Sequence, residues 1–215
     1  MENFDAGRDL GKEKSLWQLY RLAKNIPRSK SEVAVMLSAG ILMLAYVLST
    51  YFEYPDLLNQ VRSIVSDGLN FVASVLGFLV AGFTIFVTIT KTEVFVAMAK
   101  RKHSAFGELT WFKYSMAVFM YVFAHYFAFI VVAYIVKVSL AVGGPAHVAR
   151  LLLLKHWIHA DRLVWGVIGF SLLSLSLWLL HLVLLLKGFI FNIYAVVTTV
   201  VRWELEQEKK KASGG

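Results

Sequence analysis

Residues 68–90 read GLNFVASVLGFLVAGFTIFVTIT, a run of 23 residues without a charged side chain. Three more charge-free stretches lie at residues 33–52, 114–136 and 163–186, and they are 20, 23 and 24 residues long. A helix of roughly 20 apolar residues crosses the hydrocarbon core of a bilayer, which is about 30 Å thick. The sequence therefore predicts an all-α, polytopic membrane protein with four transmembrane helices.

The composition agrees with this class of protein. Of the 215 residues, 58% are hydrophobic and 17% are charged, whereas roughly 25% of the residues in a soluble domain are charged. The chain contains no cysteine, which excludes disulfides, thiolate metal sites and cysteine nucleophiles. The first apolar stretch begins only at Val33, after a charged head, so we expect an uncleaved anchor rather than a cleavable signal peptide.

The distribution of the cations predicts how the chain is oriented. Residues 1–32 hold seven Lys and Arg, residues 91–113 hold five and residues 187–215 hold five. The two remaining connections, residues 53–67 and 137–162, hold one and four. Because cytoplasmic loops carry the excess of Lys and Arg, both termini are predicted to be cytoplasmic. The same rule accounts for the net charge of +8, so no direct nucleic-acid partner is expected.

This orientation divides the chain into three segments. They are a basic cytoplasmic head (1–32), a transmembrane domain (33–186) and a cytoplasmic helical extension and tail (187–215). Within the head, residues 15–26 place apolar side chains opposite basic ones, which predicts a short interfacial helix. In the outer connection, Gly143-Gly144-Pro145 predicts a break, and a second interfacial helix is expected after it.

The fourth apolar stretch is followed by further apolar residues. Residues 188–201, after Lys187, are again uncharged, but 14 residues are too few for another crossing. We therefore expect one helix from Leu163 to about Glu208, which would be roughly 70 Å long. The second helix is expected to extend as well, because residues 94–99 are mostly apolar. Apolar surface outside the bilayer needs a partner, so a small cytoplasmic bundle of extended helices is predicted.

Small and weakly polar residues recur at every third or fourth position along the second apolar stretch. They are Asn70, Ser74, Gly77, Ala81, Thr84 and Thr88. At helical spacing these residues form one stripe, and small residues allow helices to pack closely in a bilayer. The stripe is typical of a helix–helix seam, within one subunit or between subunits. The alternative is a water-contacting pore lining, because hydroxyl and amide groups can solvate ions.

Two histidines, His125 and His181, lie inside the third and fourth apolar stretches. Ionisable side chains at membrane depth are costly and mark functional candidates. The structural interpretation is a neutral histidine that hydrogen-bonds a neighbouring helix, and the functional one is a proton relay or sensor. No acidic residue accompanies either histidine within a span, which disfavours a proton-coupled transporter.

Few other residues suggest chemistry. His156, His159 and Asp161 resemble part of a metal site, but one such cluster is weak evidence, and no metal or other cofactor is predicted. The chain has no phosphate loop, HExxH, GxSxG or intramembrane carboxylate pair, so it is not expected to be an enzyme. Basic residues at the cytoplasmic face are most simply a positive-inside retention signal, and they could also contact anionic lipid or an acidic partner. They are Lys100, Arg101, Lys102 and Arg202.

The stretch SVLGFLVAGFTIFVTITKT at residues 74–92, with the small size and the cytoplasmic ends, resembles the small four-span membrane subunit of the bacterial Kiwa antiphage defence system. The resemblance covers the spans in outline. It implies a homo-oligomer of the inner membrane, with a tetramer favoured, which senses phage attack and recruits a cytosolic DNA-binding protein. The extension 188–208 and the loop 91–113 would hold that protein.

The sequence therefore leaves two classes of function open. One is a scaffold or sensor subunit that contacts membrane lipids, further copies of itself and a cytosolic protein partner. The alternative is an oligomeric ion channel or membrane-permeabilising effector lined by the second transmembrane helix. A solute transporter is disfavoured, because the chain has four spans and no charge at the midplane.

Overall fold

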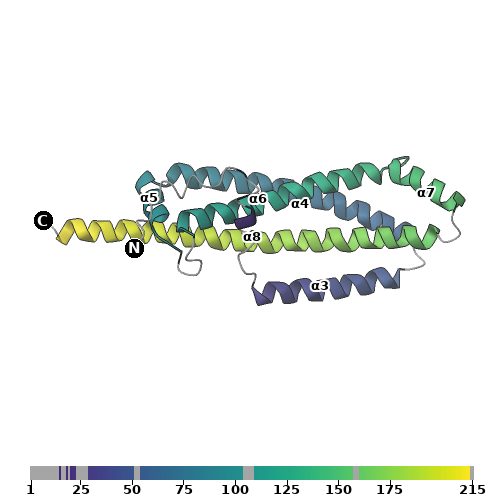
Figure 1. Cartoon of the computed structure of the whole chain (residues 1–215), viewed down its shortest axis with the longest axis horizontal. Coiled ribbons are helices and arrows are strands. Elements are labelled where there is room, and N and C mark those ends of the chain that lie inside the picture. The colour runs from purple at the N-terminus through teal and green to yellow at the C-terminus, as the bar shows by residue number, and fades with distance from the viewer. Residues whose placement is uncertain are drawn as a thin grey trace. The chain divides into compact units, whose positions relative to one another are not determined.

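The computed structural model describes residues 15, 18, 20–22, 29–50, 54–103, 109–156 and 160–213. Apart from turns, short connections and an isolated bridge between Lys102 and Thr110, these residues are helical. Figure 1 shows the course of the helices. Four of them are long and apolar enough to cross a membrane, which confirms the predicted all-α, membrane-spanning class.

The four long helices follow the predicted apolar stretches and extend past several of their ends. They are α3 (Lys30–Ser49), α4 (Tyr54–Ile89), α6 (Trp111–Ser139) and α8 (Ala160–Ser213). α4 begins well before its charge-free stretch, because Leu57, Val61 and Val65 bury an apolar face there. α8 has 54 residues and is about 80 Å long, so the prediction that the fourth helix continues past Lys187 is confirmed.

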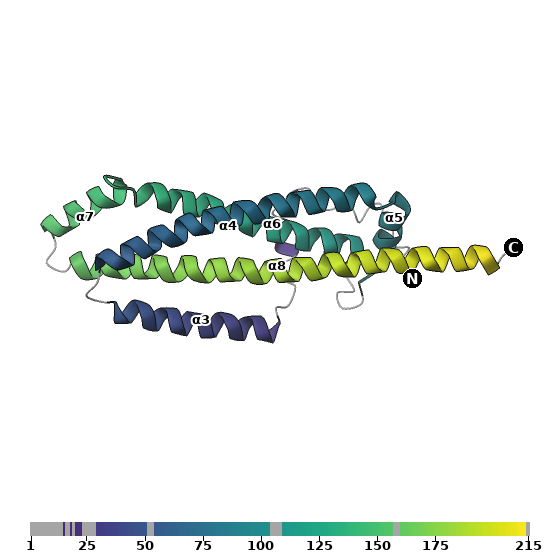
Figure 2. The same ribbon diagram turned by 180° about the vertical axis from the view of Figure 1, so that it is seen from behind.

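The second helix does not continue as expected. α4 ends before Lys91, which adopts an extended backbone with φ −62° and ψ 144°, and a separate helix α5 covers Thr92–Lys100. The break allows Val94 and Met98 to pack with Val196 of α8 in one buried cluster, and Figure 2 shows α5 beside α8. The prediction that the second helix extends through residues 94–99 is therefore wrong, because the break lets apolar residues of this segment pack within the chain.

The predicted outer connection contains both the break and the helix. α7 spans Pro145–His156. Gly143 has a φ of +76°, a conformation that glycine adopts without strain. A Cβ at Gly144 would lie 2.9 Å from the carbonyl oxygens of Ala141 and Val138. Both glycines are therefore needed for the turn that joins α6 to α7.

The chain divides into two compact units. Unit 1 comprises Met1–Pro27, Phe78–Ala124 and Leu185–Gly215, and unit 2 comprises Arg28–Gly77 and His125–Leu184. α5 belongs to unit 1, whereas α3 and α7 belong to unit 2. The helices α4, α6 and α8 contribute residues to both units.

Unit 2 is held together by close approach of its helices. A Cβ at Gly68 of α4 would lie 3.0 Å from the ring of Phe129 and 3.1 Å from Leu179, so glycine lets α4, α6 and α8 meet there. The hydroxyl of the buried Tyr126 donates a hydrogen bond of 2.9 Å to the carbonyl oxygen of Leu182. This bond satisfies a phenol between α6 and α8 that hydrocarbon could not solvate.

Aromatic rings form much of the core of unit 1. The rings of Phe83 and Phe119 stack with centroids 4.1 Å apart, and Phe119 meets Phe189 of α8 at 5.6 Å. Larger side chains also surround the cluster of Val94, Met98 and Val196. They are Phe86, Trp111, Phe112, Val200 and Trp203. The C-terminal part of α8 is thus covered on one face by α4, α5 and α6.

A short part of the basic head belongs to the described residues. Gln18 and residues 20–22 are helical, as expected for a helix within residues 15–26, and its interfacial position stays a prediction. The ring of Tyr20 stacks on that of Tyr121 of α6, with centroids 5.2 Å apart. This contact attaches the segment to unit 1; most of residues 1–28 lie outside the part of the chain that the structure describes.

We expect substitution of Gly169 to test the packing of α3 on α8. A Cβ at Gly169 would lie 2.6 Å from Cγ1 of Val47, whereas a Cβ at Gly166 would meet nothing within 4 Å. Gly169→Ala should therefore destabilise the protein by about 1–3 kcal/mol, and Gly166→Ala should not. Thermal unfolding in detergent measures both effects. Val47→Ala should restore the stability of Gly169→Ala, and equal effects of the two glycine variants would contradict this packing.

Candidate functional site

The stripe predicted on the second helix lies on an uncovered face of α4. All six of its residues are exposed: Asn70, Ser74, Gly77, Ala81, Thr84 and Thr88. Bulky residues elsewhere on the helix, including Val65, Val72 and Leu79, are buried. α4 therefore packs within each unit through these residues, while other bulky residues such as Phe78 and Ile85 are exposed beside the stripe. Among the described helices the stripe is not an internal seam, and a seam between subunits stays a prediction.

The hydroxyl groups of the stripe are bonded to α4 itself. Ser74 Oγ donates to the carbonyl oxygen of Asn70 at 2.8 Å, and Thr88 Oγ1 donates to that of Thr84 at 2.8 Å. Because these donors are satisfied, the face can lie against lipid or another helix. A Cβ at Gly77 would meet nothing within 4 Å, so there is room at this point for a second helix backbone.

The structure brings His125 of α6 and His181 of α8 together in unit 2. Their imidazole centroids are 5.5 Å apart, and the ring planes are inclined by 77°. The hydrogen bond from Tyr126 to Leu182 joins the next residue of each helix, so it fixes the same alignment of α6 and α8 that brings the histidines together. Sequence reasoning singled out both histidines but could not pair them, because the pairing depends on how two distant helices align.

The pair could act by hydrogen bonding between its two rings, or by binding a metal ion together with further ligands. A neutral imidazole carries one N–H donor and one acceptor nitrogen, so the pair can exchange hydrogen bonds across the α6–α8 contact. Among the described residues, no group of three or more His, Cys, Asp or Glu side chains could hold a metal ion. The partial metal motif predicted at residues 156–161 is not tested, because the side chains of His156 and His159 lie outside the described part of the chain.

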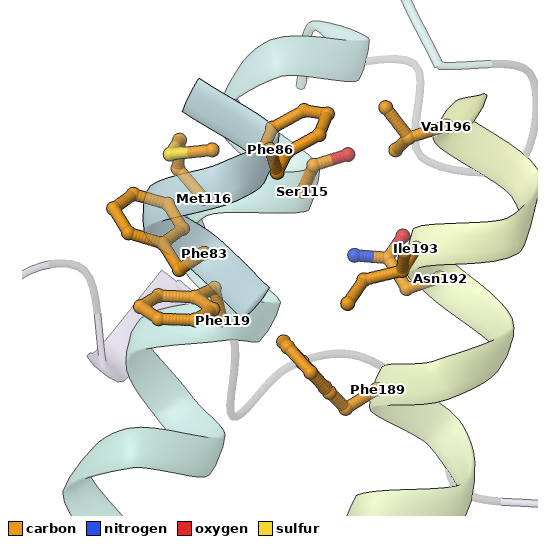
Figure 3. Close-up of a pocket in the computed structure, with 9 residues that line it drawn as sticks. All are labelled: Phe83, Phe86, Ser115, Met116, Phe119, Phe189, Asn192, Ile193 and Val196. Carbon is orange, nitrogen blue, oxygen red and sulfur yellow. The ribbon is translucent and has the colours of Figure 1, made fainter. Parts of the chain in front are cut away.

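A small cavity lies between α4, α6 and α8 in unit 1. Figure 3 shows Phe83 and Phe119 facing Phe189 and Asn192 across it. Its volume is about 20 Å³, which is enough for one water molecule and too small for an organic ligand. Ser115 also lines it, and its buried hydroxyl has no hydrogen-bond partner among the residues described. A water molecule shared with Asn192 would satisfy that hydroxyl, a feature that no sequence signal indicated.

The predicted basic surface belongs to unit 1, and its members Lys100, Arg101, Lys102 and Arg202 are all exposed. Close to α5, Lys91 Nζ and Glu204 Oε1 form a salt bridge of 2.9 Å. The hydrogen bond and charge of Glu204 raise the pKa of Lys91. Because both side chains are well exposed, the bridge aligns α8 with the end of α4 more than it adds stability.

This salt bridge also shows where the charged end of α8 begins. Phe189 contacts Phe119 in the charge-free part of α6, whereas Val196, one residue of the same apolar run, packs with Val94 and Met98 of α5. Charged residues follow only from Arg202 onward. Within unit 1, the apolar face of α8 therefore continues past Lys187 and finds its packing partners within the chain.

His103 lies just after α5 and packs against the start of α6. Its ring centroid lies 4.2 Å from that of Trp111 and 4.3 Å from that of Tyr114. Its backbone N–H donates to the carbonyl oxygen of Leu109 at 2.8 Å, and the N–H of Trp111 donates to that of Arg101 at 3.0 Å. Burial among these groups lowers the pKa of His103.

We expect this connection to loosen in mild acid. An unfolded His103 titrates near pH 6.5, whereas the folded side chain takes up its proton only at lower pH. Its contribution to stability is therefore complete above that value and declines as the pH falls below it. Exchange of the Trp111 amide hydrogen, corrected for the intrinsic pH effect, should quicken as the pH falls below about 6.5. His103→Phe should remove this dependence, and a constant corrected rate in the unsubstituted protein would contradict the expectation.

The predicted site residues thus fall into three groups, and each group belongs to a different set of helices. They are an uncovered stripe on α4, a histidine pair between α6 and α8, and a charged end formed by α5, Lys91 and the last turns of α8. No protein-family model, curated protein or solved structure matches the chain.

Proposed function

We propose that this chain is a membrane subunit that acts by assembly, with α4 facing further copies of itself. The observation that supports this most strongly is the exposure of all six stripe residues between Asn70 and Thr88. Where lipid surrounds the protein, helices associate through small residues that let their backbones approach. α4 buries Val65, Val72 and Leu79 and leaves this row of small residues outside, beside exposed bulky residues such as Phe78 and Ile85, so the row can admit a second helix.

A second surface supports a protein partner at the end of α8. One face of this helix is buried against α4, α5 and α6, and the other is apolar and exposed. The exposed residues are Ile190, Phe191, Tyr194, Val197, Val201 and Leu205. Leu205 lies beyond Arg202 and Glu204, at the charged end of α8. Apolar surface at that position favours a protein contact, and the neighbouring basic side chains favour an acidic partner.

The resemblance to the Kiwa membrane subunit suggests a biological setting for this assembly. In that setting the stripe would form an oligomer in the bacterial inner membrane, with a tetramer favoured. The charged end of unit 1 would recruit a cytosolic DNA-binding protein when phage attack disturbs the envelope. The chain itself would then work as sensor and scaffold, and its partner would act on the phage.

The alternative is an ion channel or permeabilising effector, and the exposed Asn70 on the stripe favours it. If several copies placed α4 around an axis, amide and hydroxyl oxygens would contact water there. The chain has no cysteine, so cysteines introduced at Ser74, Ala81 and Thr88 report water contact directly. A channel predicts that all three react with an aqueous thiol reagent. If they stay inert while a cysteine at Asp67 reacts, the pore is excluded and the packing surface is retained.

We expect Gly77→Leu to weaken self-association. Its side chain would occupy the space needed by a second helix, but it would meet nothing in its own chain. The population of oligomer at fixed concentration should fall by about tenfold, as measured by sedimentation in detergent. Phe78→Leu is the matched control, because Phe78 is exposed beside the stripe but not on it. An unchanged oligomer in Gly77→Leu would remove α4 from the interface.

We expect Leu205→Glu to reduce retention of a cytosolic partner. The substitution places a charge in the exposed apolar face, whereas Ala212→Glu places the same charge at an exposed position near the end of the helix. Deletion of residues 205–215 tests the same surface, and a longer deletion would remove the buried Phe189 and Val196. Affinity purification from native cells measures which proteins remain bound. Retention of the same proteins by all three variants would rule out this surface.

A further inference from the structure

A larger cavity lies in unit 2, and none of the candidate site residues described above line it. Its volume is about 250 Å³, close to the lower end of the roughly 300–1,000 Å³ found for ligand pockets. The first half of α4, the turn between α6 and α7, α7 itself and the start of α8 form its walls. Of its 13 lining residues, 11 are apolar, and the other two are Arg62 and His147.

Arg62 is held in position by the end of α6. Its Nε and Nη2 donate hydrogen bonds of 3.0 and 2.8 Å to the carbonyl oxygen of Leu140. A guanidinium carries five N–H groups, so these bonds leave further N–H groups for another acceptor. Leu140 begins the turn that requires Gly143 and Gly144. The half-buried cation is therefore oriented by a backbone carbonyl at a defined turn, and not by a carboxylate.

The lining of the cavity is complementary to a molecule with an anionic group and a hydrocarbon part. None of the 13 lining residues is Asp or Glu, so the charge of Arg62 is not neutralised by the cavity wall. Guanidinium groups bind carboxylate and phosphate oxygens through two parallel N–H donors. The apolar walls, among them Leu58, Leu153 and Ile168, favour hydrocarbon. An inorganic anion would leave these walls unused, and a neutral hydrocarbon would leave the guanidinium unmatched.

We propose that this cavity binds an acyl chain of an anionic amphiphile, whose headgroup oxygens accept hydrogen bonds from Arg62. The outward face of α7 supports entry from a membrane surface, because Val148, Leu151 and Leu152 are more than half exposed. A short helix with such a face lies at the level of lipid headgroups. The chemistry is shared by the carboxylate of a fatty acid and the phosphate of an acidic phospholipid, and the test below separates these sources.

Native mass spectrometry of the full-length protein in a nonionic detergent provides the test. The protein is mixed in turn with phosphatidylglycerol, oleate and the zwitterionic phosphatidylcholine, and bound molecules are counted. We expect phosphatidylglycerol or oleate to be retained about tenfold better than phosphatidylcholine. Arg62→Gln should abolish this preference. Lys137→Gln, which removes an exposed cation of α6 outside the cavity lining, should leave it intact.

A second pair of variants separates loss of binding from loss of fold. Ala146→Trp fills the cavity from α7 and should lower the retention of every lipid without removing a charge. Arg62→Lys keeps the charge but lacks the planar fork, so the preference should fall only partly. Retention of phosphatidylglycerol alone assigns a phospholipid, and retention of oleate alone assigns a fatty acid. Equal retention of phosphatidylcholine, an unchanged preference in Arg62→Gln, or unchanged retention of the lipids in Ala146→Trp overturns the proposal.

Discussion

Backbone hydrogen bonding is the constraint on which the rest of this structure depends. In a bilayer the N–H and C=O groups of the chain cannot bond to water, so they must bond within helices. Once the chain is committed to long helices, hydrophobicity no longer distinguishes one neighbour from another. Side-chain size and a few polar contacts then decide the packing. Gly68 in unit 2 illustrates this rule, because the absence of a Cβ brings Phe129 and Leu179 against the α4 backbone.

Polar side chains of the helices follow the same constraint. The hydroxyl of Tyr126 bonds to the Leu182 carbonyl, and Ser74 and Thr88 bond to carbonyl oxygens of their own helix. Arg62 bonds to the Leu140 carbonyl at the end of α6. Each of these side chains thus donates a hydrogen bond to a backbone carbonyl oxygen, because lipid hydrocarbon offers no acceptor. Arg62 differs from the others, because its bonds leave part of a charged group available.

The two faces of α4 divide its roles. Bulky residues such as Val72 and Leu79 are buried within the units, whereas the small-residue stripe is exposed. α8 is divided in a similar way in unit 1, where Phe189 and Val196 are buried and Tyr194 is not. Both helices therefore have one face that holds the fold and another that is open to lipid or protein. The proposed assembly uses the open faces and leaves the packed ones unchanged.

The sequence by itself determined the class of the protein, the four spans, the Gly143–Gly144 break and the long fourth helix. These features depend on runs of apolar residues and on local backbone preferences, which can be read without knowing any distant contact. The six stripe residues were also predictable as a set, because helical spacing places them on one face.

Only the tertiary structure decided which faces are covered and which residues meet. It separated α5 from α4, paired His125 with His181, and aligned Lys91 with Glu204. It also placed Arg62 against Leu140, 78 positions away in the chain. Such contacts depend on the register between helices, and the register is set by side-chain shape at many points together. An apolar run contains little information about register, because many alignments of two apolar helices bury similar surface.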